Sequence, residues 1–229
     1  MARPLRPLLP ASVIAIALLS ATPAAHAGCS TSPGPGTDWS GCRKISKVLT
    51  SYDLTGAKFV RTVLSRSNLE KAKLVKADMT KSDLSYTILR RADLTDAILS
   101  GAYGTRTFMR EARLKGADLS KAEFFRAKLA AADLSSANLN GVQLSRADMT
   151  GANLDAADAR NANLSRAKLA LASLEKTNLD NAYLYRTDLR GVDLSKTVGL
   201  RQYQLRGSCG DKETKLPGDL KMPDSWPCK

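Results

Sequence analysis

A large apolar residue recurs at every fifth position over most of the chain. From Leu54 to Leu194, 27 of the 29 positions at this spacing are Leu, Met or Phe, and the exceptions are Gly104 and Ala159. The residue two places earlier is Ala in 19 repeats and Thr, Ser or Val in nine more. No insertion or deletion breaks this register. The chain is therefore a repeat protein, and its period decides the fold class.

A period of five does not fit a regular helix or a flat strand. An α-helix advances about 100° per residue, so the apolar residue would move around its axis. In a strand successive side chains alternate faces, so an odd repeat would alternate sides. The pattern instead predicts a chain that turns a corner every five residues, with four sides in a coil of about 20 residues and coils about 4.8 Å apart. The large and the small residue of each repeat then point inward.

Several repeats carry a recognisable signature. The segments ADLSS (132–136), ANLNG (137–141), ADMTG (147–151) and ANLDA (152–156) resemble the A(D/N)LXX signature of pentapeptide-repeat proteins, and the resemblance covers residues 52–198. It implies an all-β fold, a right-handed quadrilateral parallel β-helix of about seven coils. Phe124 stands one coil after Gly104, and we expect it to lean into the volume that Gly104 leaves. Ala159 has no such partner.

The two ends differ from the array. Residues 1–27 combine Arg3 and Arg6, an apolar run and an A-x-A site, which is typical of a secretory signal peptide. We therefore expect export to the periplasm or the outside of the cell. The alternative is a lipoprotein signal with lipid on Cys29, although His26 stands where a lipoprotein cleavage box has Leu. Residues 28–51 are interpreted as an N-terminal cap, 52–198 as the solenoid and 199–229 as a C-terminal cap or tail.

The four cysteines lie in two pairs at the chain ends, and four cysteines allow three pairings. Because a long rigid array holds the two ends apart, we predict the disulfides Cys29–Cys42 and Cys209–Cys228, one in each cap.

No catalytic arrangement is visible. The only histidine is His26, which leaves with the signal peptide, so the mature chain lacks a histidine for nucleophilic catalysis or for a usual Cys/His zinc site. Eleven acidic residues of the array stand directly before the central apolar residue, where the signature asks for Asp or Asn. We predict a protein that is not an enzyme, with no cofactor, metal or small-molecule substrate.

Basic residues gather two positions after the central residue, where 14 of 29 repeats have Lys or Arg. At 20 residues per coil one column reads Arg66, Tyr86, Arg106, Arg126, Arg146, Arg166 and Arg186. Its five consecutive arginines are a candidate anion-binding strip. Neighbouring columns supply aromatic residues (Tyr103, Phe108, Phe125, Tyr183, Tyr185) and acids (Asp83, Glu123, Asp148, Asp188). The alternative is a solvated ladder that is paired with those acids.

The net charge bears on the function. The whole chain carries +13, and residues 51–200 contain 24 basic and 17 acidic residues. Some pentapeptide-repeat proteins resemble B-form DNA and protect gyrase by mimicry, but mimicry of phosphates needs a dense negative surface. We therefore expect an exported structural or interaction scaffold, whose partner is an unknown protein or an anionic envelope polymer. The alternative function is a binder of anionic polymers through the arginine column.

Overall fold

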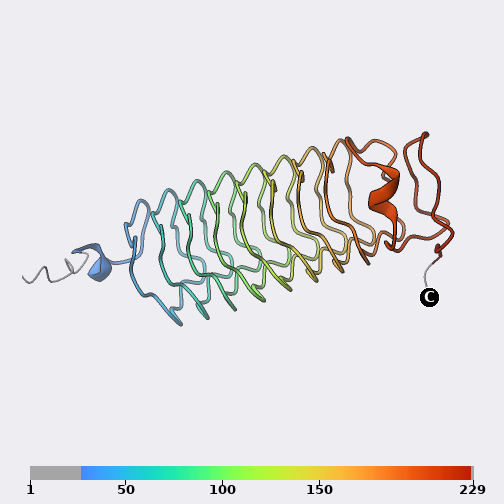
Figure 1. Cartoon of the computed structure of the whole chain (residues 1–229). Helices are drawn as coiled ribbons and strands as arrows, with labels where there is room; N and C mark the ends of the chain where they lie inside the picture. The colour runs from blue at the N-terminus through green and yellow to red at the C-terminus, as the bar shows by residue number, and fades with distance from the viewer. Residues whose placement is uncertain (1–26, 228–229) are drawn as a thin grey trace, which may run out of the picture.

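The computed structural model describes residues 27–227, which wind into a four-sided solenoid of stacked coils (Figure 1). The helices of this range are two short 3-10 turns, η1 (Ala27–Ser30) and η2 (Gln202–Leu205). No helix in residues 27–227 is long and apolar enough to cross a bilayer. Apart from its last residue, the predicted signal peptide, residues 1–27, lies outside the described residues.

Parallel backbone bridges, each isolated from the next, hold the coils together. Each bridge joins residues 20 positions apart, from Asp38–Lys58 to Asn178–Val198. The series of bridges thus starts at Asp38, inside the range 28–51 that the sequence assigns to the N-terminal cap. The period of five continues there through the buried residues Trp39, Lys44 and Leu49, but a lysine at a central position hides it. One further coil therefore precedes the predicted array.

Each corner is a tight turn with a left-handed residue. Between Leu54 and Ala57 the amide of Ala57 donates to the carbonyl of Leu54 at 3.0 Å, and the third residue, Gly56, has φ of 65°. This is the geometry of a type II turn. Residues with side chains, such as Lys71, occupy most corners in the same left-handed region, which favours glycine. Such corner residues are held by a hydrogen bond from the backbone amide to the next coil, as from Lys71 to the Arg90 carbonyl at 2.9 Å.

The Asp or Asn before the central residue closes a second turn. Asp78 Oδ1 accepts a hydrogen bond from the amide of Thr80 at 3.0 Å, and Asn153 Oδ1 accepts one from the amide of Asp155 at 2.9 Å. This Asx geometry recurs along the array and satisfies an amide that points away from the bridges. It explains why the signature asks for Asp or Asn, and it gives these side chains a structural role.

The interior consists of columns that run the length of the solenoid. Leu114, Leu134 and Leu154 stack in one column and are fully buried. Burial of one such side chain stabilises the fold by roughly 1.5–3 kcal/mol. Where Ala is replaced by Thr, the buried hydroxyl finds a carbonyl: Thr62 Oγ1 donates to the Trp39 carbonyl at 2.6 Å and Thr107 Oγ1 to that of Leu84 at 2.9 Å. These contacts satisfy polar groups that burial would otherwise leave unpaired.

The interruption at Gly104 is compensated as expected. A Cβ atom built at Gly104 would lie 2.0 Å from Cε1 of Phe124, so the phenyl ring fills the space of the missing side chain. The expectation for Phe124 is confirmed. Ala159 is buried, and nothing in the structure explains why a small residue stands there.

The N-terminal end is closed by a disulfide and a buried lysine. Cys29 and Cys42 form a disulfide with a Cα–Cα distance of 5.6 Å, which confirms the first predicted pair. Lys44 Nζ donates to the carbonyl of Cys29 at 2.5 Å and lies 3.8 Å from the centroid of the Trp39 ring. Burial lowers the pKa of the Lys44 ammonium group. These contacts fix the segment that covers the first coil.

The C-terminal tail closes the other end, where it crosses the last coil (Figure 1). Gln204, in η2, donates from Nε2 to the carbonyls of Leu179 at 2.7 Å and Ala182 at 2.8 Å. The side chain thereby satisfies carbonyls that no further coil covers. Cys209 bridges to Asp188 and is disulfide-bonded. Its predicted partner, Cys228, lies outside the described residues.

Candidate functional site

The structure brings the five predicted arginines together at one corner of consecutive coils. Their φ angles lie between 55° and 60°, and each backbone amide donates to a carbonyl of the next coil at 2.7–3.1 Å. The shared backbone geometry directs the side chains to the same side, and all five are exposed. We call this column the arginine ladder; it consists of Arg106, Arg126, Arg146, Arg166 and Arg186.

The ladder arginines have no acidic partner among residues 27–227. None of the ion pairs in this range includes a ladder residue. At the two ends, Arg106 lies 5.9 Å from the ring centroid of Tyr86, and Arg186 lies 5.3 Å from that of Tyr185. The side chains of Arg126, Arg146 and Arg166 make no hydrogen bond, ion pair or ring contact with a described residue. The ladder is therefore an unneutralised row of cations.

Two of the neighbouring acids, Asp148 and Asp188, are engaged elsewhere. Asp188 holds Arg190 through Oδ2 at 2.8 Å, and this hydrogen bond lowers the pKa of the Asp188 carboxyl. Asp148 accepts a hydrogen bond from the Thr150 hydroxyl at 2.9 Å, as the repeat geometry dictates. The structure therefore does not show the alternative, in which the ladder arginines form ion pairs with the neighbouring acids.

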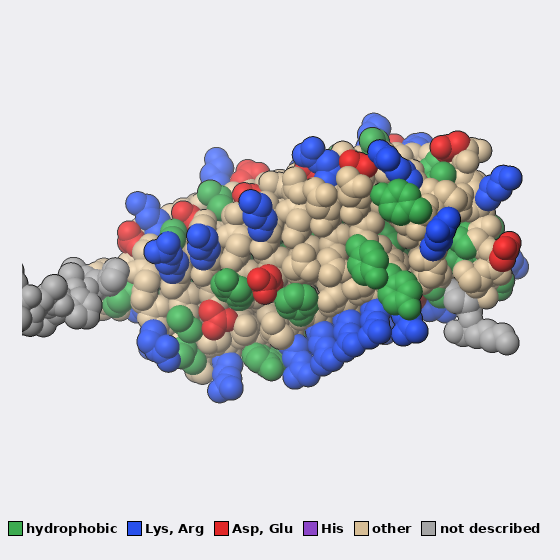
Figure 2. All heavy atoms as spheres, in the orientation of Figure 1, with side chains coloured by type: hydrophobic (Ala, Val, Ile, Leu, Met, Phe, Trp, Pro, Cys, Tyr) green, Lys and Arg blue, Asp and Glu red, His purple; other side chains and the backbone are tan. Residues whose placement is uncertain are grey.

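Two grooves lie along the ladder, and both are lined in part by Arg126 and Arg146. One groove has a volume of about 520 Å³ and the other of about 400 Å³. Figure 2 shows the continuous row of basic side chains along one edge, in the half nearer the C-terminus. The first groove is lined by Phe125, Arg126, Ser145, Arg146, Ser165, Arg166, Tyr183 and Tyr185, and the second by Arg106, Phe108, Arg126, Lys128 and Arg146. The aromatic residues of these grooves are predictable from the sequence, but Ser145 and Ser165 are not, because serine is common outside the core of this array.

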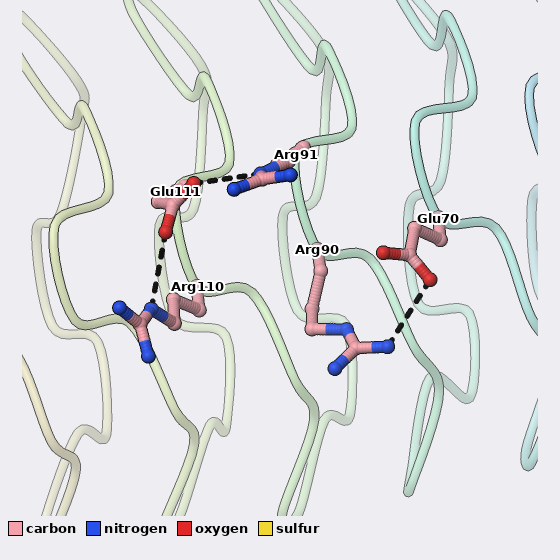
Figure 3. A pocket seen from close by; sticks show the side chains of 5 residues that line it. All are labelled: Glu70, Arg90, Arg91, Arg110 and Glu111. Carbon is pink, nitrogen blue, oxygen red and sulfur yellow. Dashed lines mark hydrogen bonds and ion pairs between the residues drawn. The ribbon is translucent and has the colours of Figure 1, made fainter.

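A second group of arginines, nearer the N-terminus, is paired with glutamates. Arg91 Nε lies 2.7 Å and Arg110 Nε 3.1 Å from the carboxylate of Glu111, and Arg90 lies 3.1 Å from Glu70 (Figure 3). The hydrogen bond from Arg91 lowers the pKa of Glu111, and the same contact raises the pKa of Arg91. We call these five residues the paired cluster. They line a hollow of about 350 Å³.

The titratable groups of the described residues do not form a catalytic set. Every carboxylate whose pKa clearly departs from its ordinary value has a lowered pKa, and that of Asp193 falls to about 2 because the Ser195 hydroxyl donates to it. A general acid at neutral pH needs the opposite shift. In residues 27–227 no group of three or more His, Cys, Asp or Glu side chains is placed to hold a metal ion.

The family model for pentapeptide repeats matches this chain in eight copies, over residues 53–85, 87–124, 127–166 and 160–197. The chain belongs to the pentapeptide-repeat family. Its fold is the right-handed quadrilateral β-helix that the sequence predicts.

Solved structures of this family resemble the chain to different degrees. A trypsin-treated variant of QnrB1, a plasmid-mediated fluoroquinolone resistance protein, is 18% identical, with 79% of this chain and 90% of that chain covered and a TM-score of 0.49. HetL, which is involved in heterocyst differentiation regulation in the cyanobacterium Nostoc sp. strain PCC 7120, is 30% identical, with 82% and 90% covered and a TM-score of 0.29. A pentapeptide-repeat protein from the Arabidopsis thaliana thylakoid lumen is 24% identical, with 57% and 70% covered and a TM-score of 0.23. No curated protein gives a significant match.

Proposed function

We propose that this protein is an exported, non-catalytic interaction scaffold, and that the arginine ladder is its contact surface for an anionic polymer. The observation that carries the proposal is the run of three adjacent arginines without a partner, Arg126, Arg146 and Arg166. Two unit charges about 4 Å apart repel by about 1 kcal/mol even in bulk water. A bound anion, which each guanidinium can hold through two hydrogen bonds, would relieve this repulsion.

The repeated spacing favours a polymer over a small ion. Consecutive ladder residues stand about 4.8 Å apart, so four steps place Arg106 and Arg186 about 19 Å from each other. A small anion would contact one or two of these residues, whereas an extended polyanion can contact all five. Binding of this kind releases counterions and weakens steeply as salt rises.

Two observations support export. The signal-like residues 1–27 precede the fold, and the Cys29–Cys42 disulfide is typical of proteins in oxidising compartments. The disulfide also favours a chain without a lipid, because a thioether-linked lipid would occupy the Cys29 sulfur. Intact mass measured without reductant should give a chain that begins at Gly28, with oxidised cysteines and no lipid. A lipid on Cys29 would contradict this part of the proposal.

The charge of the array favours a polyanion binder over a DNA mimic. A mimic would have to present acidic groups where DNA presents phosphates. The ladder presents guanidinium groups instead, and residues 51–200 hold 24 basic residues against 17 acidic ones.

The test replaces three ladder residues together, as Arg126→Gln, Arg146→Gln and Arg166→Gln. Glutamine keeps a side chain at each left-handed corner, whereas glycine would relax the backbone and change stability as well as charge. Retention is measured on immobilised polyphosphate across a salt gradient, together with the melting temperature. The matched control is Lys71→Gln, Lys73→Gln and Lys76→Gln, which removes the same charge from the N-terminal coils.

We expect the ladder variant to elute at clearly lower salt than both the parent and the lysine variant, with a melting temperature equal to or slightly above that of the parent, because the repulsion between neighbouring guanidinium groups is removed. If the ladder variant elutes with the parent, the ladder is a solvated face and the proposal is wrong. If the lysine variant loses as much retention, total charge rather than the ladder governs binding, which also contradicts the proposal.

A further inference from the structure

The larger groove beside the ladder combines three kinds of side chain. Its lining includes the serines Ser145 and Ser165, three arginines of the ladder, and the rings of Phe125, Tyr183 and Tyr185. Phe125, Ser145, Ser165 and Tyr185 form a single column, one residue from each of four consecutive coils. The two rings of this column are therefore about 14 Å apart, with the two serines between them.

The C-terminal end of the groove is an aromatic platform. The rings of Tyr183 and Tyr185 lie 6.1 Å apart between centroids with an interplanar angle of 18°. Tyr183 is 56% and Tyr185 39% exposed, and Arg186 lies beside the Tyr185 ring at 5.3 Å. Neither ring is needed to fill the core, so both are available to a ligand.

Neutral hydrogen-bonding groups continue across the same face. Gln143 and Asn163 stand in the column next to the serines, and Asn163 Nδ2 donates to Gln143 Oε1 at 2.9 Å. The hydroxyls of Ser145 and Ser165 donate to no described residue. One coil before Gln143 the same column has Glu123, whose charge would repel an anion. The favourable surface therefore extends from Arg126 toward the C-terminus.

We propose that this groove binds an acidic polysaccharide that lies along the solenoid. Sugar rings would pack on Tyr183, Tyr185 and Phe125, and their hydroxyls would hydrogen-bond to Ser145 and Ser165. The carboxylate or sulfate groups would bind the guanidinium groups of the ladder. This inference rests on the proposed function and names the class of polymer that the ladder recognises.

The arrangement fits a polysaccharide better than a single-stranded nucleic acid. Nucleic-acid grooves stack successive bases on aromatic side chains. Here the two coils between Phe125 and Tyr185 offer hydroxyls in place of rings, so bases above them would find no platform. A polysaccharide needs rings only at intervals, and it carries hydroxyls at every sugar for the polar side chains between them.

The test uses the full mature chain and the variant Tyr183→Ser with Tyr185→Ser, which introduces the residue that Ser145 and Ser165 already provide. The control is Tyr52→Ser with Tyr103→Ser, since these tyrosines are 43% and 50% exposed but lie outside the groove. Affinity is measured for heparin, as an acidic polysaccharide, for inorganic polyphosphate, which has charge but no sugar, and for an oligodeoxythymidylate. The triple ladder variant described above is measured in parallel.

We expect the groove variant to bind heparin about tenfold more weakly than the parent, and to bind polyphosphate with unchanged affinity. The control variant should match the parent on all three probes. If the groove variant binds heparin as the parent does while the ladder variant binds it weakly, the proposal that the groove recognises a polysaccharide is wrong. The proposed function of the ladder would still stand. If the ladder variant loses nothing on any probe, the proposed function itself fails. A larger loss on the oligonucleotide than on heparin would assign the groove to nucleic acid and overturn the inference.

Discussion

The paired cluster and the arginine ladder place arginines on the same kind of scaffold with opposite electrostatic results. Arg91 and Arg146 both occupy left-handed corners, with φ of 55° and 60°, and both are exposed. One coil beyond Arg91 stands Glu111, which binds it at 2.7 Å. One coil beyond Arg146 stands another arginine. The residue 20 positions away thus decides whether a corner is neutralised or left charged.

This difference shows how a solenoid turns sequence into surface chemistry. Because every coil has the same length, two residues 20 positions apart always meet, whatever they are. A single carboxylate at Glu111 contacts two arginines, Arg91 and Arg110, and offsets one of their two positive charges. The ladder has no such residue over five coils, so its positive charge accumulates along one edge.

The largest effect should follow from a break in the core that aligns both groups. Leu134→Asp would bury a charge without a partner in the fully buried column of Leu114 and Leu154. A buried charge without a partner costs about 3–5 kcal/mol, which is a large part of the stability of an ordinary domain. We expect the array to unfold or to split into separately melting parts, as measured by circular dichroism and calorimetry.

The matched control is Ser136→Asp in the same repeat. Ser136 is exposed at a corner with φ of 57°, a conformation that Asp tolerates better than most residues. We expect a melting temperature close to that of the parent. Similar melting temperatures for Leu134→Asp and Ser136→Asp would mean that the inward and outward positions have been assigned wrongly.

A smaller effect is expected at Gly104, on the coil that joins the paired cluster to the ladder. Gly104→Leu restores the usual central residue, but its Cβ would meet the Phe124 ring at 2.0 Å. Overpacking of this kind costs about 1–3 kcal/mol. Adding Phe124→Leu should recover most of this loss, so the two substitutions should be strongly non-additive in a double-mutant cycle. Additive losses in the free energy of unfolding would show that the ring does not occupy the space beside Gly104.

The fold could be predicted from the sequence because one short rule repeats without a slip. The buried columns follow from the period of five, and even the contact between Phe124 and Gly104 follows from a separation of 20 residues. The sequence assigns the coil that starts near Asp38 to the N-terminal cap because of the SPGPG segment and the cysteine pair, and Lys44 at a central position obscures the repeat there. The Lys44 ammonium group donates to the carbonyl of Cys29 and lies over the Trp39 ring. These contacts compensate for the burial of its charge, and only the three-dimensional structure reveals them.

The candidate site was only partly predictable. The alignment of the five arginines could be predicted, because it follows from the coil length of 20 residues alone. The coil length does not determine whether Asp148 and Asp188 reach the ladder, because this depends on side-chain direction. The repeat geometry directs both carboxylates to their own turns, where they accept hydrogen bonds from Thr150 and Arg190. The groove was not predictable for a similar reason. Ser145 and Ser165 become candidate binding residues only because arginines and aromatic rings lie around them in the structure.

A still smaller change in stability, with a large change in binding, is expected when the ladder is made to resemble the paired cluster. Arg146→Glu places a carboxylate between Arg126 and Arg166, as Glu111 stands beside Arg91. The exposed pairs should raise stability by at most about 1 kcal/mol. Retention on polyphosphate should fall further than for Arg146→Gln, because the new carboxylate also neutralises its neighbours. Lys121→Glu, an equal charge change at an exposed corner of another column, is the control. An equal loss of retention in that control would contradict a local role of the ladder.

The smallest effect should come from the paired cluster itself, as a function of pH. The hydrogen bond from Arg91 lowers the pKa of Glu111 from its ordinary value of 4.5. A carboxyl group whose pKa is lower in the folded state adds stability above its unfolded pKa, and this contribution is lost as the pH falls through its folded pKa. The melting temperature of Glu111→Gln should therefore lie slightly below that of the parent between pH 5 and 7, and the gap should close as the pH falls below about 4. High salt at neutral pH should also narrow the gap, because exposed pairs are screened. A gap that widens toward low pH would show that Glu111 stabilises the cluster through packing rather than through its charge.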